Sequence, residues 1–72
     1  MFLMWFDDDR KKSASQKISD ALAAYERRTG GRANVVLVNA TEVGEAPLPV
    51  KVRPEPYIQP SNFYVGVEDL AQ

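Results

Sequence analysis

The sequence predicts an α+β fold: a small mixed β-sheet with element order β-α-β-β-β and one amphipathic helix packed on one face. Three observations predict it. The chain opens on an apolar run, a helical period of apolar residues follows, and three short strand-like stretches come after it. The strand candidates are residues 2–6, 34–38, 50–53 and 62–68. The 72 residues contain no internal repeat, so we expect a single small domain, 1–72.

The first strand candidate and the helix candidate are both legible from local sequence. "FLMWF", residues 2–6, is bulky and apolar throughout, which suits a strand covered on both faces. The helix is predicted at residues 13–29, because Ser13 and Gln16 fit a capping box and Gly30 suits a left-handed helix end. Its apolar face consists of Ala14, Ile18, Ala21, Leu22 and Tyr25.

The remaining three strand candidates differ in pattern. "NVVLV", residues 34–38, is a β-branched run typical of a central strand. Residues 50–53 and 62–68 alternate apolar and polar side chains, which indicates strands with one covered face. Because a helix separates the first two strands, we expect these two to be parallel and joined by a right-handed crossover. The last two strands are expected to return antiparallel.

Composition narrows the class of protein. The chain has no cysteine and no histidine, so disulfides and thiolate or imidazole metal sites are excluded. No apolar run approaches the roughly 20 residues of a membrane helix, and the apolar start is too short for a signal peptide. The apolar and charged fractions are those of globular proteins. We therefore expect a soluble cytoplasmic protein without a membrane partner.

Catalytic and cofactor chemistry find little support. The serines have no histidine to activate them, and the lysines lie in polar sequence contexts. Two carboxylates such as Asp7 and Asp9 at the end of a strand are able to hold Mg²⁺, but an acidic approach to the positive N-terminus of the helix explains them as well. We favour the second interpretation and expect no catalytic residue, no metal and no cofactor.

Nucleic-acid binding is the alternative function. It would use the basic stretch at residues 10–32, whose candidate residues are Arg10, Lys11, Lys12, Lys17, Arg28 and Arg32. On a helical wheel these charges are spread around the helix and its two ends, and the isoelectric point of about 5.2 is low for such a protein. A solvated helix surface explains the same residues.

The proline-rich segment "RPEPYIQP", residues 53–60, raises a different hypothesis. None of its prolines has the P-x-x-P spacing that polyproline receptors bind, so a stiff connector is favoured over a ligand. Tyr57 and Ile58 are the large apolar residues inside it, and we expect them to pack inward.

The favoured function follows from a mismatch in coverage. One helix covers one face of a sheet, whereas residues 2–6 and 34–38 are apolar on both faces. The second face must be covered by the proline segment or by another protein, because large exposed apolar patches are rare. We therefore predict a non-enzymatic protein-interaction module whose partner is another protein or a second copy in a homodimer. The predicted interface residues are Leu3, Trp5, Tyr57 and Ile58, with Trp5 chosen for its size.

Overall fold

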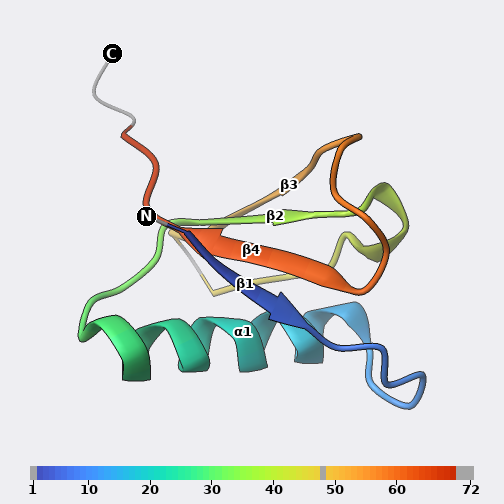
Figure 1. Ribbon diagram of the computed structural model, residues 1–72, viewed down its shortest axis with the longest axis horizontal. Coiled ribbons are helices and arrows are strands. Elements are labelled where there is room, and N and C mark those ends of the chain that lie inside the picture. Colours follow the sequence, from blue (N-terminus) through green and yellow to red (C-terminus); the bar gives the residue numbers. More distant parts are fainter. Residues whose placement is uncertain (1, 48, 70–72) are drawn as a thin grey trace.

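The structure, a computed structural model, describes residues 2–47 and 49–69 and shows a four-stranded mixed sheet with one helix along one face (Figure 1). The elements are β1 (Phe2–Phe6), α1 (Ala14–Thr29), β2 (Val35–Val38), the 3-10 helix η1 (Ala40–Glu42), β3 (Lys51–Pro54) and β4 (Asn62–Gly66). The predicted α+β class and the order β-α-β-β-β are confirmed. Only the last strand differs by more than one residue at an end, because it stops at Gly66 and not at residue 68.

The strand order across the sheet is β1-β4-β2-β3. β4 lies between β1 and β2 and is antiparallel to both, so β1 and β2 run in the same direction without being neighbours. β3 is parallel to β2, and the expectation that both of the last strands return antiparallel is therefore wrong for β3. The reason is the connection: residues 39–50 are long enough to carry the chain back along the sheet before β3 begins.

The ends of α1 follow from local capping. The Ser13 hydroxyl accepts a hydrogen bond from the Gln16 N–H at 3.1 Å, which satisfies one of the free amides of the first turn. The Gln16 side chain donates to Asp20 at 2.9 Å and does not return to the Ser13 backbone, so only half of the predicted capping box forms. Gly30 ends the helix at φ 74°, with its N–H bonded to the Glu26 carbonyl.

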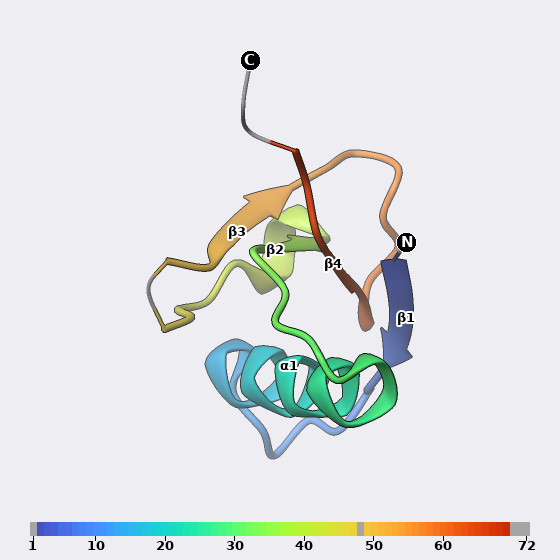
Figure 2. The ribbon, with the colours of Figure 1, turned by 90° about the vertical axis from the view of Figure 1, so that its left-hand side faces the viewer.

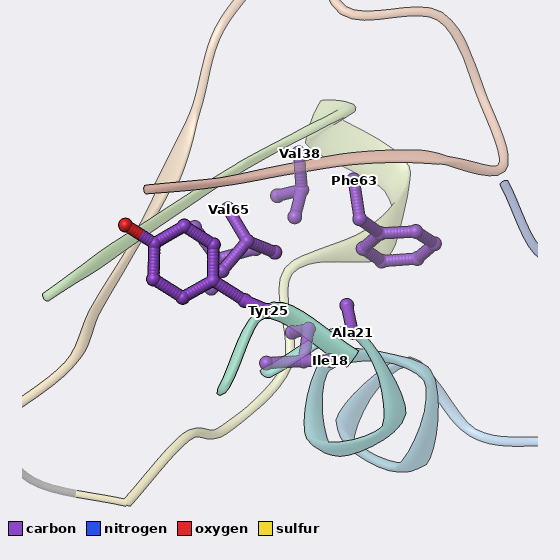
Figure 3. Packing of buried hydrophobic residues seen from close by; sticks show 7 residues of the cluster. Ile18, Ala21, Tyr25, Val38, Phe63 and Val65 are labelled. Carbon is purple, nitrogen blue, oxygen red and sulfur yellow. The ribbon is translucent and has the colours of Figure 1, made fainter. Parts of the chain in front are cut away.

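The main core lies between α1 and the sheet (Figure 3). The helix contributes Ile18, Ala21 and Tyr25. The sheet contributes Val36 and Val38 of β2 and Phe63 and Val65 of β4. Burying each of the larger side chains is worth about 1.5–3 kcal/mol, so this cluster contributes substantially to the stability of the fold.

The strand register decides which side chains of β1 face the helix. Leu3 lies beside Val65 and Trp5 lies beside Phe63, and both pack against the core under α1. Phe2, Met4 and Phe6 point to the opposite side, which we call the open face. The expectation that Trp5 lies on the face left uncovered by the helix is therefore wrong, and the same holds for Leu3.

The proline segment covers part of the open face. It crosses the side of the sheet opposite α1 after leaving β3 (Figure 2). Ile58 is only 3% exposed and packs against Val35 and Leu37 of β2. Tyr57 is 68% exposed, so inward packing is confirmed for Ile58 and wrong for Tyr57. A tight turn explains the difference, because the Ile58 N–H bonds to the Glu55 carbonyl and the two side chains leave the turn in different directions.

Candidate interaction surface on strand β1

Within the described strands, the large apolar side chains that remain exposed all belong to β1. Phe2, Met4 and Phe6 are 40%, 56% and 60% exposed and occupy alternate positions on the open face; we call them the β1 stripe. An aromatic side chain has about 150–250 Å² of surface, so the stripe exposes roughly 300 Å² of apolar area. Patches of this size on monomers are often functional.

The stripe is uncovered because the cover of the open face stops short of β1. Ile58 reaches β2, and Tyr64 of β4 is already half-buried beside it. On the β3 side, the Arg53 guanidinium forms a bidentate ion pair with Glu68 and also binds Glu55 at 2.9 Å. On the open face, the ion pairs of Arg53 therefore cover β3 and Ile58 covers β2. No residue of the described chain covers the stripe on β1.

Strand β1 is also an unprotected edge of the sheet. It lies at one end of the strand order and carries neither a charged residue nor a proline. The opposite edge, β3, has the features that block pairing with other chains: Lys51 and Arg53 are charged and exposed, and the strand ends in Pro54. The two edges therefore differ in their readiness to accept another strand.

The acidic turn after β1 is engaged within the chain. The Asp7 carboxylate accepts from the Asp9 N–H at 3.0 Å, and the Asp9 carboxylate accepts from the Lys11 N–H at 2.9 Å. Lys12 binds Asp7 at 3.3 Å and Asp20 at 3.0 Å, and its hydrogen bond lowers the pKa of the Asp20 carboxyl. Within residues 2–47 and 49–69, no cluster of three or more metal-ligating side chains is found.

The basic residues considered for nucleic acid do not form one patch. Arg10 and Lys11 are exposed in the turn before α1, while Lys12 is held by its two carboxylates. Arg28 and Arg32 lie at the other end of a 16-residue helix, about 24 Å away at 1.5 Å per residue. A continuous positive stripe along the phosphates of a nucleic acid is therefore not present on these elements.

Lys17, the sixth basic candidate, is buried. It is 7% exposed, and its ammonium lies 3.7 Å from the Glu42 carboxylate of η1. Glu42 also accepts from the N–H of Ser61, which takes a left-handed conformation at φ 68° just before β4. Sequence reasoning missed this because Glu42 lies far along the chain; the available signal was the spacing of Lys17, Ala21 and Ala24 on one buried side of the helix.

The predicted interface residues are thus dispersed. Leu3 and Trp5 lie on the helix side of β1. Ile58 is buried against β2 on the open face, and Tyr57 is exposed in the turn between β3 and β4. The predicted set of β1, Leu3 and Trp5, is the one that packs under the helix, and the β1 stripe is the alternate set of the same strand. In an uninterrupted apolar run, alternation does not indicate which set faces the helix.

A groove of about 520 Å³ lies beside the C-terminal half of α1. It is lined mainly by apolar side chains, among them Leu22, Ala33 and Val50, and by the opposite charges of Glu26 and Arg32. None of the described residues that line it is a serine, cysteine or histidine, so these residues provide no pairing of a nucleophile with a base.

Among the residues that the structure describes, no helix has the length and apolar character needed to cross a membrane. Comparison with protein-family models, with curated proteins and with solved structures gave no match.

Proposed function

We propose that the protein is a small, non-enzymatic interaction module that associates with a second copy of itself through the β1 stripe. The observation that carries the proposal is the coincidence of Phe2, Met4 and Phe6 on an uncovered face with an unprotected sheet edge. Domains of this size have marginal cores and frequently gain stability from self-association.

The size and charge of the surface favour a second copy over a large partner. Joining two stripes removes at most roughly 600 Å² of apolar area from water. At the usual apolar share of about 60%, this corresponds to about 1,000 Å² of total area, below the roughly 1,200–2,000 Å² of stable interfaces between proteins. We therefore expect a weak homodimer, whose share of the molecules rises with protein concentration. The net charge of −1 per chain gives little repulsion between copies, and two-fold dimers are the commonest assemblies.

The proposal places the module in the cytoplasm. Small secreted domains are commonly stapled by disulfides, and this chain contains no cysteine.

The test is the mass in solution over a wide range of concentration. Wild-type protein is expected to shift from the 8.1 kDa monomer toward twice that mass in sedimentation velocity or light scattering. Met4→Lys places a charge in the centre of the stripe and should keep the chain monomeric. Val43→Lys is the matched control, because Val43 is exposed to a similar extent, 52% against 56%, but lies in the loop after η1.

Two outcomes would count against the proposal. A wild-type chain that stays at 8.1 kDa up to the highest attainable concentration would refute self-association. If the Met4→Lys and Val43→Lys variants form dimers of equal affinity, the interface lies elsewhere on the molecule.

A further inference from the structure

The register between β1 and β4 shows which N–H and C=O groups of β1 point toward β4 and which point away from it. The Asp7 N–H donates to the Ser61 carbonyl at 2.9 Å, and Phe6 lies opposite Asn62. In an antiparallel ladder, the N–H and C=O groups of successive residues turn alternately toward and away from the neighbouring strand. The polar backbone groups of Leu3, Trp5 and Asp7 therefore face β4.

It follows that the N–H and C=O groups of Phe2, Met4 and Phe6 point outward from the sheet edge. The same three residues carry the side chains of the β1 stripe. The exposed strand thus presents backbone hydrogen-bonding groups and apolar side chains from one set of residues, and no other strand of the described chain pairs with this edge.

We infer that two copies pair edge to edge through antiparallel β1 strands centred on Met4, which joins two four-stranded sheets into one continuous sheet. The inference rests on the proposed self-association and specifies its geometry. Met4 lies opposite Met4 of the partner subunit, and Phe2 lies opposite Phe6 of the partner subunit.

This register is the one that uses every outward group. Outward-facing residues pair with outward-facing residues only when the strands are shifted by an even number of positions. With Met4 at the centre, Phe2, Met4 and Phe6 each face an outward residue of the other strand, and each pair exchanges two hydrogen bonds. A shift by two positions in either direction leaves one stripe residue of each copy unpaired. Each Phe also gains an aromatic neighbour across the strands.

Charge favours the antiparallel over the parallel direction. Asp7, Asp8 and Asp9 follow β1 directly. Parallel pairing would set the two acidic turns side by side, where like charges repel. Antiparallel pairing places them at opposite ends of the joined strands. The β3 edge does not compete, because Lys51 and Arg53 are charged and Pro54 has no N–H to donate.

Disulfide cross-linking tests the register, since the chain has no cysteine of its own. In the inferred pairing the two Met4 Cα atoms are about 5.5 Å apart, within the range that a disulfide spans. Met4→Cys should therefore give a covalent dimer under mild oxidation. Phe2→Cys and Phe6→Cys should each cross-link poorly alone, and an equimolar mixture of the two should cross-link efficiently. Val43→Cys is the exposed control.

The outcomes separate the geometry from the function. If the wild-type chain dimerises but Met4→Cys cross-links no better than Val43→Cys, the register is wrong and the proposed self-association stands. Efficient cross-linking of Phe2→Cys with itself would indicate a parallel or shifted pairing and would also overturn the inference. A wild-type chain that never dimerises removes both proposals.

A backbone substitution separates edge pairing from face-to-face packing of the stripes. Met4→Pro removes the outward N–H but no hydrogen bond to β4, so the monomer should fold, as circular dichroism and thermal melting would show. We expect Met4→Pro to weaken the dimer at least tenfold more than Met4→Ala, which keeps the N–H. Equal weakening would favour face-to-face packing and refute the edge pairing.

If Met4→Pro does not fold, hydrogen exchange of the wild-type amides of Met4 and Phe6 tests the edge pairing. Their exchange should slow as the protein concentration rises. Unchanged exchange in a formed dimer would refute the pairing.

Discussion

Arg53 is the residue that closes the open face over β3. Its guanidinium binds Glu68 and Glu55, and its pKa is raised by the hydrogen bond to Glu68. The Glu68 pKa is lowered, first by the hydrogen bond from Arg53 and further by the charge of Lys51. This ion pair therefore ties Glu68, two residues beyond the end of β4, to Arg53 of β3 while Glu68 is ionised.

The lowered pKa of Glu68 gives stability a defined pH dependence. A carboxyl whose pKa is lower in the folded chain stabilises the fold above its ordinary value of 4.5 and loses that contribution as the pH falls through the folded value. Thermal melting temperature should thus decline below about pH 4.5. Glu68→Gln should melt lower than wild type at pH 7 and show a shallower acid decline, whereas Glu45→Gln should follow wild type. An acid decline that Glu68→Gln leaves unchanged would assign the effect to other carboxyls, such as Asp20.

At the scale of elements, the loop after η1 is fixed on the first turn of α1. The Glu45 N–H donates to the Ser15 hydroxyl at 2.8 Å. A Cβ atom at Gly44 would lie 2.7 Å from the Ser15 nitrogen and 2.9 Å from its hydroxyl oxygen. This contact leaves no room for a side chain at position 44 and holds the loop after η1 against the helix.

Gly44→Ala is therefore expected to destabilise the fold by about 1–3 kcal/mol, the usual cost of forcing an extra methyl group into a filled space. Chemical denaturation measures the change in the free energy of unfolding. Gly31→Ala is the control, because the nearest atom to its new Cβ would be the Thr29 hydroxyl oxygen at 3.9 Å. Equal losses in the two variants would show that chain flexibility, and not the contact with Ser15, determines the cost.

Features that depend on neighbouring residues could be predicted from the sequence, whereas features that depend on residues far apart in the chain could not. The limits of α1 were predictable because Ser13, Gln16 and Gly30 act within a few residues of each end. The direction of β3 was not, because it depends on how the loop after η1 packs against the helix and the core through Glu45 and Ala46. The side of the sheet on which Trp5 lies was equally hidden, since it is decided by the register with Phe63. The β1 stripe follows from the same register.

At the scale of the whole molecule, the two sheet edges have opposite properties. The Lys51 N–H donates to Asn34 and the Glu55 N–H donates to Val38, so the backbone groups of Val52 and Pro54 face outward from β3. Proline offers no N–H, which leaves this edge poor in donors. In contrast, all three outward residues of β1 have an N–H group to donate.

Restoring the missing donor should change the assembly. In the double variant Lys51→Val with Pro54→Val, both edges of the sheet are expected to pair, and light scattering should show masses that continue to grow beyond a dimer. Adding Met4→Lys to this variant blocks β1 and should return the assembly to a finite size. A double variant that stops at the dimer would show that features other than the charge and the proline protect β3.

Pro54 thus has a consequence for stoichiometry. A subunit with one reactive edge is monovalent, and its association ends when two edges have met. A subunit with two reactive edges is divalent, so that pairing of β1 with β1 and of β3 with β3 in alternation has no end point and yields a growing assembly. In the proposed assembly, the charges of Lys51 and Arg53 together with the missing N–H of Pro54 would therefore limit association to a reversible pair and prevent an open-ended polymer.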